Sequence, residues 1–249
     1  MSLLSVENVS MRFGGVSAVT DVTFAIGHDS LLGFIGPNGA GKTTLMRIMT
    51  GVLRPQQGRV LFNGIDITHW PIYRRIGAGL ALAQQIVRPL RSLNLIDNVA
   101  LAVGVKRMPR PWQALLRTNR HEERVIAKHL LNKVGIGDAA ETKPDALPLG
   151  YLKRLEVARA LALEPTLLLL DEPLAGLNQS EAQSMADLIA SLAGNGRSVV
   201  LIEHNIREVA RICPMLYVQD NGHALLYGKT AEVMSDPELQ RAYLGSTAN

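Results

Sequence analysis

The chain has 249 residues, of which 47% are hydrophobic and only 4% aromatic, and its formal net charge is +4. These values predict one large globular domain, with or without a sizeable subdomain, and exclude a disordered chain. No apolar run approaches the roughly 18 to 20 residues of a membrane span. The single Cys213 cannot form an internal disulfide, and the first residues lack the pattern of a secretory signal. We therefore expect a protein of a reducing compartment that does not cross a bilayer.

The first 84 residues have the pattern of short strands. Strand-forming residues gather at 3–9, 18–26 and 31–35, and a further strand follows at 59–62. Asn63-Gly64 then predicts a tight turn of the hairpin type. The third strand leads directly into a glycine-rich loop.

This loop has the G-x-x-x-x-G-K-T spacing of a P-loop. Its residues are Gly36, Pro37, Asn38, Gly39, Ala40, Gly41, Lys42 and Thr43, and Thr44 opens a helix-favouring segment. Glycines let the loop turn several backbone N–H groups toward one phosphate chain, and the helix start adds its positive dipole end. Lys42 can reach the β and γ oxygens, and the Thr43 hydroxyl can bind Mg²⁺. Because strand, loop and helix signals agree, the sequence predicts a nucleoside triphosphate site rather than a chance turn.

The β signal disappears over residues 85–150. Apolar residues recur there at helical spacing, at 94–102 and 122–134. In the second of these segments they are Val125, Leu130, Leu131 and Val134. We therefore expect a helical subdomain at 85–150, inserted between 1–84 and 151–249, which form the core of a single domain over 1–249.

The basic excess is concentrated in this insertion, between Lys106 and Lys128. We interpret these charges as a solvated helical face, with contact to lipid headgroups or a partner as the alternative. The excess is mild, and we expect no nucleic-acid partner.

Strand and helix signals alternate in the last hundred residues. Strands are predicted at 166–170 and 198–202 and helices at 151–162 and 180–193, the order of parallel βαβ units. A hairpin and a short capped helix complete the chain. The predicted fold class is α/β, with the core of a P-loop NTPase and a mixed sheet.

Two acids follow the apolar run at 167–170. The run delivers Asp171 and Glu172 to the carboxyl edge of a sheet, where ligands of open α/β folds bind. Asp171 can hold Mg²⁺, and Glu172 can orient or deprotonate an attacking water. The pair favours hydrolysis over binding alone.

Several segments together resemble the ATPase subunits of ABC transporters. The family signature, usually Leu-Ser-Gly-Gly-Gln before a basic helix, corresponds to Leu147-Pro148-Leu149-Gly150-Tyr151. Ala175-Gly176-Leu177-Asn178 matches the D-loop, His204 the switch histidine, Gln85 the Q-loop glutamine and Phe13 the aromatic residue at the adenine. The resemblance covers essentially the whole chain. It implies ATP and Mg²⁺ as ligands, an N-terminal antiparallel β subdomain and an inserted helical signature subdomain.

The resemblance also implies a role for each residue. Phe13 would stack on the base, His204 would donate to the γ-phosphate, and Gln85 would contact Mg²⁺ or the attacking water, with Gln84 as the alternative. Gly150 would face the γ-phosphate of ATP held by a partner subunit.

The signature departs from the family pattern at Pro148, which replaces a serine and offers neither a hydroxyl nor an N–H donor. We therefore predict a weaker ATP-bound dimer than an intact signature gives. The variant Pro148→Ser should raise dimerisation and the ATPase rate measured with the membrane partner, and no gain in either would contradict this.

Within the family, the chain resembles the LivG-type subunits of bacterial branched-chain amino acid importers. The segments are Phe13-Gly14-Gly15, the basic insertion around residues 104–120, Ala175-Gly176-Leu177-Asn178, Ile202-Glu203-His204 and residues 236–245. This implies a peripheral ATPase at the cytoplasmic face of the bacterial inner membrane. Its partners would be permease subunits, a second ATPase subunit and, indirectly, a periplasmic solute-binding protein. The alternatives are importers of urea or short amides, a lipopolysaccharide-type exporter, a DNA-repair or translation ATPase, and a metabolic P-loop kinase.

Overall fold

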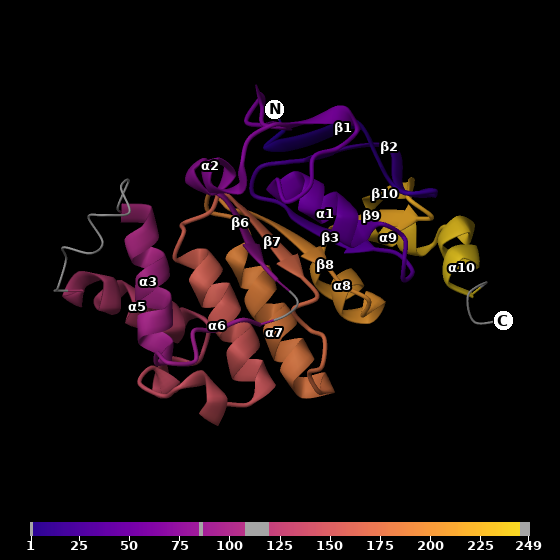
Figure 1. Cartoon of the computed structure of the whole chain (residues 1–249). Helices are drawn as coiled ribbons and strands as arrows, with labels where there is room; N and C mark the ends of the chain where they lie inside the picture. The colour runs from indigo at the N-terminus through magenta and orange to yellow at the C-terminus, as the bar shows by residue number, and fades with distance from the viewer. Residues whose placement is uncertain (1, 85–86, 108–119, 245–249) are drawn as a thin grey trace.

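Two sheets with helices packed around them form the fold (Figure 1). The structure is a computed structural model, and it describes residues 2–84, 87–107 and 120–244. The elements up to the helical region are β1 (Leu4–Phe13), β2 (Val16–Ile26), β3 (Leu31–Ile35), α1 (Lys42–Thr50), β4 (Gln57–Phe62), β5 (Ile65–Asp66), α2 (Ile72–Gly77) and β6 (Leu80–Ala83). Those that follow are α3 (Leu95–Arg107), α5 (His121–Lys133), α6 (Leu149–Leu161), β7 (Leu167–Asp171), α7 (Gln179–Leu192), β8 (Ser198–Ile202), α8 (Ile206–Ile212), β9 (Met215–Asp220), β10 (His223–Lys229), α9 (Thr230–Met234) and α10 (Pro237–Leu244).

The central sheet has six strands in the order β10-β9-β3-β8-β7-β6. Its neighbouring strands pair in parallel except for β10, which runs antiparallel to β9. Successive residues of one strand face different cores: Leu168 and Leu170 pack on one side of the sheet, and Leu167 and Leu169 on the other. Because both faces are covered, β7 is apolar along its length. The carboxyl ends of β3 and β7 therefore emerge at one edge, carrying the P-loop and the two acids.

The second sheet is antiparallel, in the order β2-β1-β4-β5. Its apolar side chains share a core with β3 and with the apolar residues of α1, among them Leu45, Ile48 and Met49. In Figure 1 the helix α1 accordingly lies between the two sheets. The P-loop helix is thus held from both sides.

Helices α3, α5 and α6 pack together on the other side of the central sheet (Figure 1). Three residues of α5 bear on the sequence interpretation. Val125 is 57% exposed and lies outside the apolar face, which is formed by Ala127 and Leu131 instead. Arg124, expected on a solvated face, forms ion pairs with Asp97 and Glu141, the latter at 2.8 Å. Lys128 Nζ donates to the carbonyl of Gly137 at 2.7 Å. Arg124 thus ties α5 to α3, and Lys128 ties α5 to the segment that follows it.

The predicted α/β fold class is confirmed, including the mixed sheet and the antiparallel sheet. The strands expected at 31–35 and 198–202 have those bounds. The sequence reasoning missed short elements, above all β6, α2 and α8, which have four to seven residues each. Such pieces are too short to show a periodicity, and packing against neighbours defines them. None of the helices within the described ranges combines the length and apolar character needed to cross a membrane.

Candidate active site

The P-loop joins β3 to α1 at the carboxyl edge of the central sheet. A Cβ atom on Gly36 would lie 2.1 Å from the backbone oxygen of Gln219, and one on Gly41 would lie 2.0 Å from the backbone oxygen of Ala18. Both obstacles are backbone atoms of paired strands, so only glycine fits at either position. The loop therefore has the close backbone wrap that a phosphate chain requires.

The ammonium group of Lys42 lies over this loop. Nζ donates to the carbonyl oxygens of Gly36 at 2.7 Å and Pro37 at 2.9 Å, and only 5% of the residue is exposed. Burial lowers the pKa of Lys42, while the carboxylates of Glu172 and Asp171 act in the opposite direction. The positive charge thus stands beside the start of α1, where an anion is favoured.

The far end of α1 is fixed by two devices. Gly51 adopts a left-handed conformation with φ 82°, which caps the helix. Arg75, 1% exposed, donates from Nη1 to the carbonyl oxygens of Ile48 at 2.8 Å and Met49 at 2.6 Å. A guanidinium complements the negative end of a helix dipole, although burial lowers the pKa of Arg75 to about 10. The helix that presents the P-loop is therefore anchored at its opposite end.

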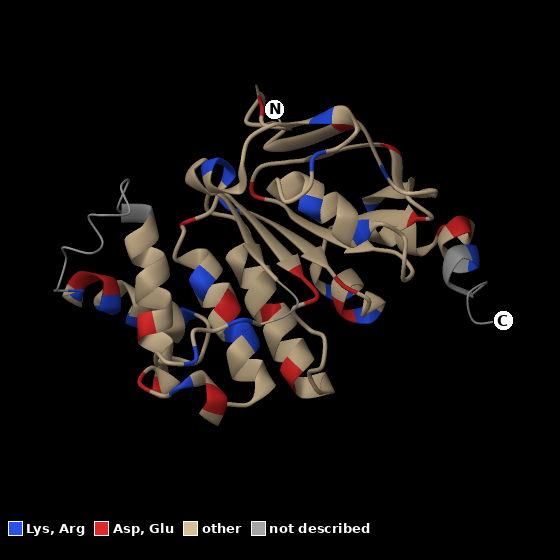
Figure 2. Cartoon of the chain, in the orientation of Figure 1, with Lys and Arg blue, Asp and Glu red and all other residues tan. Residues whose placement is uncertain are grey.

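Asp171 ends β7 beside the start of α1, and the chemistry around it suits a divalent cation. A pocket of about 300 Å³ is lined by Thr43, Gln84 and Asp171 together. Asp171 is 7% exposed, and its Oδ1 is buried without a hydrogen-bond partner among the described residues. Burial, and then the neighbouring charge of Glu172, raise the pKa of Asp171 to about 6. A carboxylate oxygen, a hydroxyl and an amide fit Mg²⁺, which prefers oxygen ligands. Figure 2 shows acidic residues at the ends of the central strands.

Glu172 and His204 come from the ends of neighbouring strands and meet. His204 Nε2 donates to Glu172 Oε1 at 2.5 Å, and His204 follows β8 just as Glu172 follows β7. Glu172 has φ 49°, a left-handed conformation that is strained for a residue with a side chain. The two acids therefore have different surroundings: the carboxylate of Glu172 pairs with the imidazole of His204, and that of Asp171 suits a metal ion.

Two buried charged residues that the sequence reasoning did not single out hold this arrangement together. Lys153 of α6 is 5% exposed and donates to the backbone oxygen of Glu172 at 3.0 Å. Glu203 is 3% exposed and accepts from the backbone N–H of Leu174 at 2.6 Å and of His204 at 3.2 Å. Glu203 thereby joins the segment after Glu172 to the one that carries His204. For Glu203, the only sequence signal was its position between an apolar strand and a histidine.

We expect the ionisation of Glu203 to destabilise the fold. Burial raises its pKa from 4.5 to about 7, against two backbone hydrogen bonds that lower it. Because the folded state binds this proton more tightly, the stabilisation is fully present below the unfolded pKa and is lost as pH rises through about 7. Glu203→Gln cannot ionise, so between pH 5.5 and pH 8 it should lose about 1 to 3 kcal/mol less unfolding free energy than the wild type. Urea unfolding at both pH values measures this, and equal losses would contradict it.

The other predicted site residues are distributed as follows. Phe13 ends β1 and is 47% exposed, on the hairpin whose Ala18 touches Gly41. Asn38 and Gly39 are exposed in the loop, Ala40 is buried, and Thr43 is exposed in the first turn of α1. Gly150 lies in the first turn of α6, where a Cβ would meet side-chain atoms of Glu181 and Leu177. Gln85, predicted to act on Mg²⁺ or water, lies outside the described residues, as does Ile86.

These features define the class of a P-loop ATPase: a glycine loop with a buried lysine, a carboxylate suited to a metal, and a second carboxylate paired with a histidine. The chain matches the ABC transporter family over residues 19–175 and belongs to that family. It is accordingly an ATP-hydrolysing subunit of the ABC transporter class.

Relatives with different tasks are similarly close. The chain is 33% identical to the high-affinity branched-chain amino acid transport ATP-binding protein LivG of Escherichia coli K12 over 249 residues, covering 98% of each. It is 31% identical to the lipopolysaccharide export system ATP-binding protein LptB of Haemophilus influenzae over 245 residues, again covering 98% of each. Among solved structures, an ATP-binding cassette of an ABC transporter in its ADP conformation superposes with a TM-score of 0.85 at 28% identity, covering 98% of this chain and 99% of that one. The identities do not single out the LivG branch.

Proposed function

We propose that this chain is one ATPase subunit of a dimeric motor that drives an importer of branched-chain amino acids or similarly small solutes. Two copies, or this chain and a similar subunit, bind two ATP molecules, each between the P-loop of one subunit and the signature helix of the other. The observation that carries the proposal is the position of Gly150. A Cβ on Gly150 would meet side-chain atoms of Glu181, in the first turn of α7, and of Leu177, but none of the P-loop of the same chain. Leu149, the first residue of α6, is 42% exposed, and the N-cap Pro148 makes no side-chain hydrogen bond, which supports contact of this helix start with a second subunit.

Within each site the chain's residues divide the work of hydrolysis. The P-loop N–H groups and Lys42 hold the phosphates, and Thr43 and Asp171 hold Mg²⁺, which supplies charge neutralisation to the phosphate oxygens. Glu172 takes the position of the general base that orients an attacking water, and its partner His204 fixes the direction of that carboxylate. Phe13 offers its exposed ring to the base.

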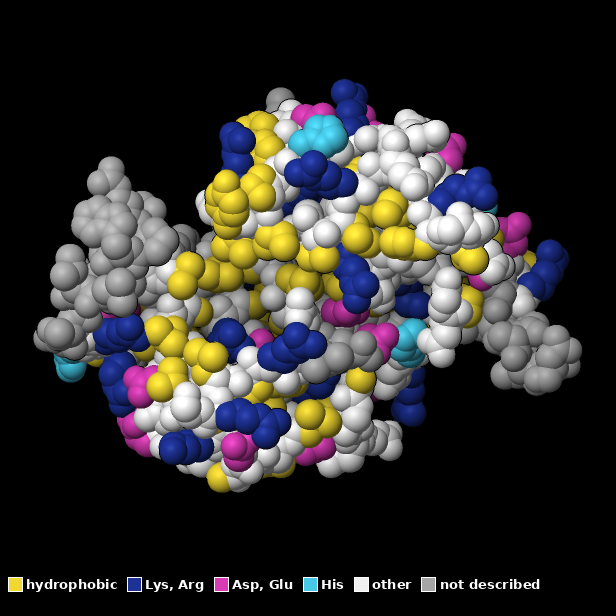
Figure 3. All heavy atoms as spheres, in the orientation of Figure 1, with side chains coloured by type: hydrophobic (Ala, Val, Ile, Leu, Met, Phe, Trp, Pro, Cys, Tyr) yellow, Lys and Arg dark blue, Asp and Glu magenta, His cyan; other side chains and the backbone are white. Residues whose placement is uncertain are grey.

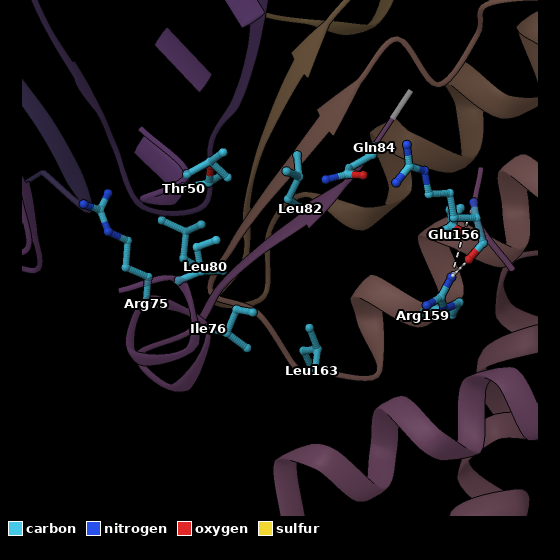
Figure 4. A pocket seen from close by; sticks show the side chains of 12 residues that line it. Thr50, Arg75, Ile76, Leu80, Leu82, Gln84, Glu156, Arg159 and Leu163 are labelled. Atoms are coloured by element: carbon cyan, nitrogen blue, oxygen red, sulfur yellow. Dashed lines mark hydrogen bonds and ion pairs between the residues drawn. The ribbon is translucent and has the colours of Figure 1, made fainter. Parts of the chain in front are cut away.

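A groove next to this site suits a helix of a membrane partner. A pocket of about 290 Å³ lies between α2, β6 and α6 (Figure 4). Its apolar lining includes Val52, Ile72 and Leu163, and its polar side is formed by Arg88, Glu156 and Arg159. Figure 3 shows this face hollowed, with hydrophobic side chains along the hollow and basic ones beside it.

The groove continues into the pocket that is lined by Thr43 and Asp171. Val52, Leu82, Gln84 and Arg88 line both cavities. Glu156 Oε1 accepts from the backbone N–H of Arg88 at 3.1 Å, so the segment between the two cavities is tied to the signature helix α6. We propose that a cytoplasmic helix of the permease binds here, where closure of the dimer moves it.

The importer assignment rests on the LivG-like segments of the sequence. Lipopolysaccharide export is the second candidate, favoured by the similar identity to LptB proteins. In either case the protein would act peripherally at the cytoplasmic face of the inner membrane.

The test is co-purification from native membranes. We expect the tagged wild-type chain to bring down hydrophobic permeases whose neighbouring genes include a secreted binding protein; lipopolysaccharide-export membrane proteins would instead establish the second candidate. Ile72→Asp, at a groove residue that is 44% exposed, should lose the permeases and keep nucleotide binding. The matched control is Val125→Asp, at a similarly exposed residue of α5, which should keep both. Retention of the permeases by Ile72→Asp would refute the groove assignment.

A further inference from the structure

Gln219 is a buried polar side chain without a hydrogen bond. It lies near the end of β9 and is 0% exposed, and both Oε1 and Nε2 of its amide lack a partner among the described residues. Burying an amide without pairing it costs stability, so such a group calls for a function. The argument holds whichever way round the amide is placed, because both of its polar atoms are unpaired.

The side chain and backbone of Gln219 together lie beneath the P-loop. Its backbone oxygen would lie 2.1 Å from a Cβ on Gly36, and its Nε2 would lie 2.8 Å from a Cβ on Gly41. One residue therefore touches both glycines that bound the loop. The turn that follows β9 adds a further support, because the N–H of Gly222 donates to the carbonyl of Ala40 at 3.0 Å.

The loop needs a second hydrogen-bond donor when its lysine binds phosphate. Lys42 Nζ donates here to the carbonyls of Gly36 and Pro37, at 2.7 and 2.9 Å. A P-loop lysine that reaches phosphate oxygens gives up such bonds, and Gly36 is buried, so its carbonyl cannot turn to bulk water. The unpaired amide of Gln219 lies beside Gly41, at the other end of the same loop.

We propose that Gln219 is a positioning residue of the nucleotide site, whose amide hydrogen-bonds to the P-loop backbone when Lys42 binds the phosphates. The inference rests on the proposed binding of ATP at this loop. This role explains why the amide is unpaired in the present structure, where Lys42 donates to the loop carbonyls. It also implies that Gln219 lowers the stability of the nucleotide-free protein and raises its affinity for nucleotide.

Tyr217 provides a matched control on the same strand. Its hydroxyl is also buried and unpaired, and its side chain lies on the same side of β9, two residues earlier. Its ring, however, packs against Phe34 with centroids 4.5 Å apart and against Phe24 at 4.8 Å. Removing this hydroxyl deletes a comparable unpaired group within an aromatic cluster.

The experiment compares Gln219→Met with Tyr217→Phe, measuring the melting temperature without nucleotide and the affinity for ATP with Mg²⁺ by calorimetry. For Gln219→Met we expect a melting temperature equal to or above that of the wild type, and an affinity about five- to tenfold weaker. For Tyr217→Phe we also expect a melting temperature equal to or above that of the wild type, but an unchanged affinity for ATP. A residue with a merely structural role would not give a variant that is as stable as the wild type, or more stable, and yet binds ATP more weakly.

Two results would overturn the proposal. The first is wild-type ATP affinity in Gln219→Met. The second is a melting temperature of nucleotide-free Gln219→Met below that of the wild type. The amide would then stabilise the loop already in the nucleotide-free protein. Binding of ATP by the wild type and its loss in Lys42→Ala test the nucleotide site itself, so failure of that site is distinguishable from failure of the role of Gln219.

Discussion

Lys42→Ala is expected to reduce ATP affinity at least about 100-fold, below the range of calorimetric detection at ordinary protein concentrations. The ammonium of Lys42 is the buried cation over the P-loop, 5% exposed, and it is already desolvated. A positive charge that is already removed from water before binding attracts an anion more strongly than a positive charge that is still solvated. Backbone N–H groups of the loop alone do not replace a full positive charge at the phosphates.

The same substitution has a predicted effect without nucleotide. Lys42 Nζ satisfies the carbonyls of Gly36 and Pro37, so its removal should also lower the unfolding free energy by about 1 to 3 kcal/mol. Lys133→Ala, at an exposed lysine in the last turn of α5, removes an equal charge far from the loop and should leave both quantities unchanged. Undiminished nucleotide affinity in Lys42→Ala would show that another group holds the phosphates.

The parts of the proposed site that the sequence predicted are runs of neighbouring residues. The P-loop from Gly36 to Thr43 and the pair Asp171 and Glu172 are contiguous, and each follows a strand whose apolar run is readable by itself. Their meeting at one edge follows from the parallel order of β3, β8 and β7. Local pattern and fold class were therefore sufficient for these residues.

The residues that the sequence did not reveal act through contacts between distant segments. Arg75 reaches the carbonyls of α1 across 26 and 27 positions, and Gln219 lies beneath a loop that precedes it by some 180 residues. Lys153 sits in a helix of basic composition, where nothing in the sequence marks it as the buried lysine bonded to Glu172. Such roles depend on which side chain the completed fold encloses.

Asn178, in the segment that matches the D-loop, has a local structural role. Its side chain accepts from the N–H of Glu181 at 3.0 Å while its own N–H donates to Glu181 Oε2 at 3.0 Å. This reciprocal capping box starts α7. Pro148 similarly occupies the N-cap position of α6 without a side-chain hydrogen bond, which leaves the first N–H groups of that helix for another partner.

Glu172→Gln should retain ATP binding and lower the hydrolysis rate by about 10² to 10⁴-fold. The amide keeps the volume of the carboxylate and can still pair with His204, but it cannot accept a proton from an attacking water. The substitution also removes a negative charge that raises the pKa of Asp171, so the metal-type carboxylate ionises more readily. Loss of binding is therefore not expected, and phosphate release together with calorimetric titration separates the two effects.

A matched control and a second readout make this test selective. Glu232→Gln removes an exposed carboxylate near Lys229 and should leave hydrolysis unchanged. The charge of Glu172 repels Asp171 but attracts Lys42 and Lys153, so Glu172→Gln should change the melting temperature little. A slow variant that is stable and binds ATP can have lost only the chemical step. Normal turnover would instead require a different base.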